Sequence, residues 1–344
     1  MSFTRDKRDQ IKNYILEKID ARDNGYVEKA ANAYSISDKT VYRYLKEMVA
    51  DGILIKNKRQ YRLSYEEFRY KIKRIEAAEL GEDYVYHQNI LKHIEALNTN
   101  VRSIWDYGFT EIMNNAIDHS EADNILILVR KNHLWTSMAI IDDGIGIFEK
   151  IRKKYNLLSV NDAINELFKG KLTTDSQHHS GEGIFFTSRL MDIFAAVSDG
   201  AVFTHNKYSE ISEDLDSIPI SELDKTSGGT CVYMSLSNSS NKVAADIFNS
   251  YASVEGGFTK TSIPLKNIYD IPPVARSQAK RLVRRLENFE EVILDFEGVE
   301  AIGQGFAHEL FVVFQNSHPG TRLVPINANS TVNRMIAHVL MSCP

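Results

Sequence analysis

The chain has 344 residues, of which 43% are hydrophobic and 25% are charged, a composition typical of a soluble protein with two or three domains. It has no run of about 18 apolar residues, no apolar signal core in its first residues and only two cysteines, so we expect a cytoplasmic protein with no membrane span and no disulfide framework. The net charge of −5 conceals a basic N-terminal end, since residues 1–75 hold 18 Lys and Arg against 11 Asp and Glu. Such an end either contacts a polyanion or is simply a set of helices whose charged faces are solvated.

Residues 1–66 are predicted to form three short helices followed by a β-hairpin. Apolar residues recur at helical spacing over residues 9–18, 27–34 and 37–49. Ser37 or Asp38 can cap the third helix, and Gly52 suits a left-handed helix end. The apolar residues on either side of a cationic turn at 56–60 then indicate two paired strands.

This order of elements resembles the winged helix-turn-helix domain of bacterial transcription regulators. The resemblance implies that the third helix enters the major groove of double-stranded DNA, with the hairpin turn along phosphate or the minor groove. A winged helix that contacts only protein is the alternative. The residues implied to face DNA are Lys39, Thr40, Tyr42, Arg43 and Lys46 on the helix, and Lys58 and Arg59 at the turn.

Residues 67–98 are charged and have a helical period, so we expect a helical connector there. Its apolar positions are Phe68, Ile72, Ile75 and Leu80. The next block, residues 99–242, mixes predicted helices and strands, contains the glycine motifs described below, and could begin near residue 85.

A helix predicted over residues 109–120 places Glu111 and Asn115 one turn apart on one face. A carboxylate and an amide oxygen in this arrangement can hold Mg²⁺ and orient a water molecule. Magnesium usually takes only one or two oxygen ligands from protein when phosphates and waters supply the others. Taken alone, this pair of residues is common on helix surfaces.

Two predicted strands follow, at residues 124–129 and 134–141, and the second runs into Asp142-Asp143-Gly144-Ile145-Gly146. An Asp at a strand end can accept a hydrogen bond from an exocyclic amine, and the glycines allow the backbone to approach a planar base. Further along, Ser180-Gly181-Glu182-Gly183 precedes an apolar helix predicted over residues 184–195. The free N–H groups at such a helix start bind phosphate.

These motifs, in this order and followed by Gly229-Thr230, resemble the GHKL superfamily of ATPases, which unites DNA gyrase, heat-shock chaperone ATPases, histidine kinases and mismatch-repair proteins. The resemblance implies an α/β sandwich that binds ATP or ADP with Mg²⁺. It implies that Glu111 is the general base, Asn115 the Mg²⁺ ligand and Asp142 the group that recognises the adenine amine. The other implied nucleotide contacts are Gly144, Gly146 and Ile147 in the adenine loop, Ser180, Gly181 and Gly183 at the phosphates, and Thr230, which supports the adenine end.

The resemblance also implies a lid over residues 148–180, with Lys169, Lys171, Thr173 and Thr174 as candidate phosphate neighbours. Two positions depart from the usual pattern. Asp143 stands where an Asn is more usual, and the carboxylate of Glu182 should repel phosphate unless it points away. We therefore expect nucleotide binding, with weak Mg²⁺-dependent hydrolysis.

The last block, residues 243–344, alternates strand and helix patterns, which indicates a small α/β layer. It resembles STAS-like domains, relatives of the anti-sigma-factor antagonist fold. That fold presents a phosphorylatable Ser at the start of the helix after a strand, whereas here Gly303-Gln304-Gly305 holds no hydroxyl. The domain is expected either to bind a protein partner or to serve a structural or dimerising role.

Together these patterns predict an α+β protein of several domains: a winged helix, a GHKL α/β sandwich and a small STAS-like domain. The function we expect is that of an ATP-binding regulator, in which Mg-ATP controls the DNA-binding winged helices of a homodimer. The alternatives are a protein serine kinase of the anti-sigma type and a DNA-gripping ATPase of a defence system.

Overall fold

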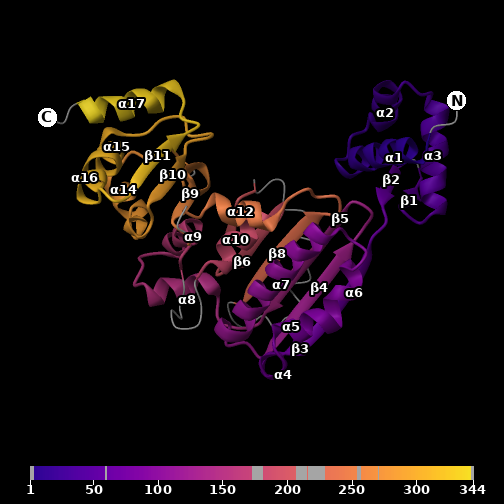
Figure 1. Cartoon of the computed structure of the whole chain (residues 1–344), viewed down its shortest axis with the longest axis horizontal. Helices are drawn as coiled ribbons and strands as arrows, with labels where there is room; N and C mark the ends of the chain where they lie inside the picture. The colour runs from indigo at the N-terminus through magenta and orange to yellow at the C-terminus, as the bar shows by residue number, and fades with distance from the viewer. Residues whose placement is uncertain are drawn as a thin grey trace.

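The computed structural model describes residues 4–58, 60–172, 181–206, 215, 229–253, 257–269 and 271–341. They form a mixed α and β structure in which a large sheet lies between an N-terminal helical unit and a C-terminal α/β unit (Figure 1). Along these ranges, every helix is too short or too polar to cross a membrane.

The N-terminal unit contains the predicted three helices and hairpin. These are α1 (Arg5–Asp20), α2 (Tyr26–Tyr34), α3 (Asp38–Ala50), β1 (Leu54–Asn57) and β2 (Gln60–Leu63). Ser37 caps α3, as predicted, by accepting a hydrogen bond from the backbone N–H of Thr40. Ile11, Leu45 and Met48 are fully buried in a core of this unit's own, so the apolar face of α3 points inward and its polar face is left to solvent.

The prediction of a helix was wrong for the start of the connector. Residues Glu66–Lys73 form strand β3, which pairs antiparallel with β4 (Asn124–Lys131). Phe68, Tyr70 and Ile72 pack against the core of the large sheet at a spacing of two, whereas Ile75 and Leu80 are exposed. The apolar residues at every second position therefore reflect a strand, and the helical spacing read from Phe68, Ile72 and Ile75 does not correspond to a helix here. The short helices α4 (Arg74–Leu80), α5 (Glu82–Val85), η1 (Tyr86–Ile90) and α6 (Leu91–Ile94) follow.

The central unit is a six-stranded sheet in the order β3-β4-β5-β8-β6-β7, with antiparallel neighbours throughout. Its register pairs Asp142 with Thr230, which places the two predicted adenine-side residues together at one end of the sheet. Helix α7 packs on one face of the sheet and carries Glu111 and Asn115 (Figure 1). The elements are β5 (Trp135–Asp142), β6 (Ile193–Ser198), β7 (Ala201–Thr204), β8 (Thr230–Ser237), α7 (Thr99–His119), α8 (Ile147–Lys154), α9 (Val160–Lys169), α10 (Gly183–Leu190) and α12 (Ala244–Ser250).

The helix predicted over residues 184–195 was too long at its C-terminal end. Helix α10 ends at Leu190, Met191 is extended, and β6 begins at Ile193. Phe194 and Ala195 are buried on opposite faces of the sheet, as successive residues of a strand must be. A strand buried on both faces is apolar at every position, so its sequence lacks the period that would distinguish it from a buried helix. The boundary between α10 and β6 therefore could not be placed from the sequence.

The C-terminal unit has a parallel three-stranded sheet in the order β11-β10-β9. Its elements are β9 (Lys260–Pro264), α13 (Leu265–Ile268), α14 (Arg276–Leu282), η3 (Leu286–Asn288), β10 (Glu291–Asp295), α15 (Gln304–His308), η4 (Glu309–Phe314), α16 (Gln315–Ser317), β11 (Arg322–Ile326) and α17 (Ser330–Met341). Its core includes Phe185 and Phe186 from α10, so the central and C-terminal units share buried side chains.

Candidate functional site

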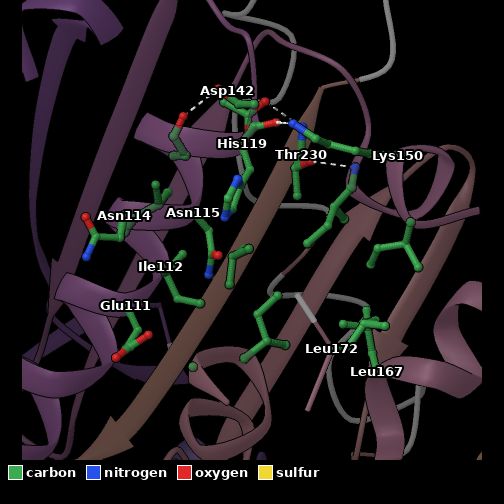
Figure 2. Close-up of a pocket in the computed structure, with 18 of the residues that line it drawn as sticks. Glu111, Ile112, Asn114, Asn115, His119, Asp142, Lys150, Leu167, Leu172 and Thr230 are labelled. Atoms are coloured by element: carbon green, nitrogen blue, oxygen red, sulfur yellow. Dashed lines mark hydrogen bonds between the residues drawn. The ribbon is translucent and has the colours of Figure 1, made fainter. Parts of the chain in front are cut away.

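A cavity of about 350 Å³ lies between α7, the strand ends at Asp142 and Thr230, and the starts of α8 and α10 (Figure 2). This volume is within the range of about 300–1,000 Å³ found for small-ligand pockets. The predicted site residues that line the cavity are Glu111, Asn115, Asp142, Ile147, Gly181, Gly183 and Thr230. Residues far apart in the chain therefore meet around one space, as the motif order had predicted.

Helix α7 supplies one wall of this cavity. Glu111, Asn115 and His119 follow one another at intervals of four residues, so they share the helix face that borders the cavity (Figure 2). The Glu111 carboxylate also reaches the glycine turn, because a Cβ atom on Gly183 would lie only 2.1 Å from Glu111 Oε2. A side chain at position 183 would displace this carboxylate.

Asp142 lies at the opposite end of the cavity and is 6% exposed. Its Oδ1 accepts hydrogen bonds from the backbone N–H groups of Gly144 (3.1 Å) and Thr230 (3.3 Å). Burial raises the pKa of the Asp142 carboxyl to about 7, against the lowering effect of those two donors. Both bonds use Oδ1, which leaves Oδ2 as an acceptor for a donor group on a ligand.

The turn after Asp142 is folded tightly against its surroundings. A Cβ on Gly144 would lie 2.0 Å from the Ser120 carbonyl oxygen, and one on Gly146 would lie 2.0 Å from Asp199 Oδ1. Neither glycine lines the cavity; their role is to allow this close packing, and Ile145 and Ile147 supply the apolar surface instead.

Ser198 and Asp199 support this loop, and the sequence analysis missed both. The backbone N–H of Ile147 donates to Ser198 Oγ (3.1 Å) and to Thr230 Oγ1 (3.2 Å). Asp199 Oδ2 accepts from the N–H of Glu149 at 3.0 Å, within the first turn of α8. Ser198-Asp199-Gly200 has the composition of a turn, but only the packing of β6 beside β8 places it under Gly146.

Asp143, which departs from the usual pattern, has a structural role. Its Oδ1 accepts from the backbone N–H groups of Asp123 and Asn124, and its Oδ2 accepts from the Asn124 side-chain amide. These hydrogen bonds lower the pKa of the Asp143 carboxyl. An Asn at this position could accept with one oxygen only, so the carboxylate satisfies a donor set that the amide could not.

The phosphate side of the cavity is formed by Gly181, Gly183 and Ile184 at the start of α10. Gly181 has a φ of +72°, and its carbonyl accepts a hydrogen bond from the N–H of Leu172 (3.1 Å). Glu182, between the two glycines, is not among the residues that line the cavity. Ser180, Thr173 and Thr174 lie outside the described residues.

Lys169 and Lys171, the predicted phosphate neighbours, do not line the cavity. Lys169 is fully buried, and its ammonium group donates to Glu166 Oε1 (2.6 Å) and to the carbonyl of Arg284 (2.8 Å). Lys171 donates to the carbonyl of Asn288 (2.9 Å). Among the described residues, a cation that does border the cavity is Lys150 on α8, whose Nζ donates to the His119 carbonyl (2.6 Å).

The residues predicted to face DNA lie on the outside of the N-terminal unit. Lys39, Tyr42, Arg43 and Lys46 are exposed along α3, and Lys58 is exposed at the hairpin turn with a φ of +53°. Thr40 is half-buried, because its hydroxyl lies 3.0 Å from Ser37 Oγ in the helix cap. Arg59 lies outside the described residues.

Comparison with known families identifies two of the units. Residues 107–240 match the family of histidine kinase-, DNA gyrase B- and HSP90-like ATPases, and residues 278–333 match a STAS-like domain of unknown function. The chain therefore contains a GHKL-type ATPase domain and a C-terminal STAS-like domain. No curated protein matches the chain.

Domains of this ATPase type bind ATP, generally with Mg²⁺. The cavity suits that pair of ligands. Asn115 offers an amide oxygen for a hard cation, Asp142 a buried carboxylate for an amine, and Gly183 a space that any larger residue would fill. The apolar surface between them comes from Ile112, Ile140, Ile145, Ile147 and Val232.

Proposed function

We propose that this protein binds ATP with Mg²⁺ and that the bound nucleotide controls DNA binding by the N-terminal unit, in a homodimer. The observation that carries the proposal is the path of β5. At one end of this strand Trp135 donates its indole N–H to Asp20 of α1 (3.0 Å), and at the other end Asp142 lines the cavity. Strand β5 thus contacts both the nucleotide site and the N-terminal unit, which carries α3.

A second set of contacts supports this coupling. In the turn between β4 and β5, His133 Nε2 lies 3.2 Å from Asn13 Oδ1, and Leu134 packs against the core of the N-terminal unit. Asn238, just beyond β8, donates to the carbonyl of Asn132 (2.9 Å) in the same turn. The two strands that carry adenine-side residues, β5 and β8, therefore each have one end beside the N-terminal unit.

The chemistry follows from the residues around the cavity. Asp142 would accept a hydrogen bond from the adenine amine, with Thr230 and Ile147 closing the loop over the base. Asn115 would hold Mg²⁺ together with phosphate oxygens, and the metal would neutralise charge on the phosphates. Glu111, one turn away on the same face, would accept a proton from an attacking water.

One form of the kinase alternative would have the ATPase domain phosphorylate the C-terminal unit of the same protein. The structure of that unit does not favour this. At the position where the antagonist fold presents its Ser, a Cβ on Gly303 would lie 2.5 Å from the Val274 carbonyl oxygen. A hydroxyl-bearing side chain does not fit there without movement of the loop that includes Val274.

Fluorescence anisotropy on a duplex selected from a random DNA pool tests the proposal. We expect Mg-ATP to change the DNA affinity at least about tenfold, which corresponds to a coupling free energy of about 1.4 kcal/mol. Equal affinities with and without Mg-ATP would refute the regulator. Sequence-independent binding with DNA-stimulated hydrolysis would favour the DNA-gripping ATPase instead. Light scattering of the same sample tests the homodimer.

The role of Glu111 is tested separately. Glu111→Ala should reduce ATP turnover by about 100-fold or more, the range for loss of a general base, while ATP binding measured by calorimetry is retained. Asp106→Ala, an exposed carboxylate on the same helix that does not line the cavity, is the matched control. Unchanged turnover in the Glu111 variant would remove that residue as the base.

A further inference from the structure

Two helices border the phosphate side of the cavity, and both are joined to the STAS-like domain. We call residues 181–183 on this side the phosphate turn. Helix α9 ends at Lys169, before the turn, and α10 begins at Gly183, within it. Leu167 from α9 and Ile184 from α10 both line the nucleotide cavity. A smaller space of about 40 Å³, bordered by Gly170, Leu172 and Gly181, continues from the cavity between these helices.

The C-terminal end of α9 is held by a buried ionic cluster. Lys169 is 0% exposed, and its ammonium group donates to Glu166 and to carbonyls of Arg281 and Arg284 in the STAS-like domain. Burial lowers the pKa of Lys169, and the carboxylate of Glu166 opposes that shift. Arg285 completes the cluster by donating to Glu166 Oε2 (2.9 Å).

The backbone that leads from α9 into the turn is held in the same way. Thr261 Oγ1, on β9, donates to the carbonyl of Lys169 (2.7 Å). The Lys171 carbonyl accepts from the Arg285 guanidinium. Leu172, the next residue, donates to the carbonyl of Gly181. A continuous chain of contacts therefore runs from the STAS-like domain to the glycine turn that faces the expected phosphates.

Helix α10 is joined to the STAS-like domain by its apolar face and by one cation. Phe185 (1% exposed) and Phe186 (6% exposed) lie in that domain's core, packed against Phe258. Arg189, near the end of the helix, donates to the carbonyl of Ser262 on β9 (3.0 Å). The helix that begins at Gly183 is thus bound to β9 and to the core beside it.

The adenine side of the cavity is built differently. The hydrogen bonds of Asp142, Thr230, Ser198 and Asp199 described above all stay within the ATPase sheet and its loops. A shift of α14 and β9 would therefore reach the phosphate turn before it reached the adenine loop.

We infer that the STAS-like domain positions the phosphate turn, with Lys169 as the central positioning residue, and so sets the affinity for the nucleotide's phosphates separately from that for adenine. This rests on the proposed nucleotide binding. A protein or small ligand that displaces α14 would act on ATP affinity through this cluster.

The test is Lys169→Met in the full-length protein, which removes the ammonium group, keeps most of the unbranched side chain and leaves Glu166 paired with Arg285. We expect ATP and ADP to bind about tenfold more weakly in calorimetry, a typical size for such coupling, while adenosine binds within about twofold of wild type. Hydrogen exchange should speed up at residues 170–172 and 181–184 but not in β5. Thr261→Val removes one cross-domain hydrogen bond with little change of shape. It should also weaken ATP binding, but by less than Lys169→Met does. This variant keeps the test informative if the Met variant does not fold.

The matched control is Lys131→Met. Lys131 on β4 also pairs with a carboxylate, Glu66 on β3 (3.1 Å), but both residues lie on strands of the ATPase sheet, outside α9, α10 and the STAS-like domain. It should leave ATP affinity within about twofold of wild type. Equal losses for ATP and adenosine in the Lys169 or Thr261 variants, or no loss for either, would overturn the inference while leaving nucleotide binding intact. If wild-type protein bound neither ligand, the proposed function itself would fail.

Discussion

The ATPase domain has two junctions, and they are built from different kinds of contact. The N-terminal unit meets it through polar pairs such as Trp135 with Asp20, both partly solvent-exposed. The STAS-like domain meets it through buried aromatic rings, Phe185 and Phe186, and through the buried Lys169 cluster. Buried packing is lost at high cost, whereas exposed polar pairs exchange readily with water.

The kind of contact at each junction sets which unit can move while the rest of the protein stays folded. The N-terminal unit has its own core and meets the sheet through exposed polar pairs and the partly buried Leu134, so we expect its repositioning to cost little. The STAS-like domain shares its core with α10, so it and the phosphate side of the site respond together. An input through the STAS-like domain and an output through the N-terminal unit fit this asymmetry.

The largest expected effect is at the buried junction. Phe185→Ala removes a ring that is 1% exposed and should lower the free energy of unfolding by about 3–5 kcal/mol, as is usual for large-to-small changes in a core. Leu134→Ala at the N-terminal junction should cost well under half of that, because Leu134 is only partly buried. Urea unfolding followed by circular dichroism measures both, and comparable losses would remove the contrast between the junctions.

Asp142→Asn should weaken nucleotide binding yet stabilise the empty protein. The folded-state pKa of Asp142 is raised to about 7 from 3.8, so the contribution of this group to the free energy of unfolding is greatest below pH 4, falls as the pH rises from 4 to 7, and is level above that. The Asn variant lacks this fall and should be more stable at pH 7.5 by on the order of 4 kcal/mol, the value of a shift of about three pKa units. Thermal melts at pH 4.5 and 7.5 measure it; parallel profiles for the two proteins would exclude a raised pKa.

Arg43→Ala should act on DNA binding alone. Arg43 is exposed on α3 and its closest acidic partner is Glu47 on the same helix (3.6 Å), so its loss should leave folding and ATP binding unchanged. If it reads a base, affinity for the selected duplex should fall by about 1–3 kcal/mol. An anisotropy titration measures this change, with Arg276→Ala on the STAS-like domain as an exposed-arginine control that should have no effect.

Trp135→Phe should have the smallest effect on stability and a specific effect on coupling. Loss of the hydrogen bond to Asp20 at an exposed position should cost under about 1 kcal/mol. The response of DNA affinity to Mg-ATP should shrink, while DNA affinity without nucleotide changes little. A full response in this variant would show that β5 does not carry the signal.

Much of the candidate site could be predicted because its chemistry is local in sequence. Glu111 and Asn115 share a face through helical spacing alone, and Asp142 ends a strand that runs into glycines. Ser198, Asp199 and Lys150 were missed, since their roles come from contacts with segments about 30 to 50 residues away. The family resemblance placed Lys169 and Lys171 near the phosphates, although packing directs both to the STAS-like domain.

Periodicity and residue chemistry over a few turns were enough to predict the order of domains, the amphipathic faces of the helices and the cluster of nucleotide motifs. By contrast, long-range packing sets the place of residues 66–73 as the edge strand of the sheet and directs the phenylalanines of α10 into the following domain. Strand pairing and burial of a charged cluster depend on which distant surfaces come together, and short-range patterns do not encode that choice.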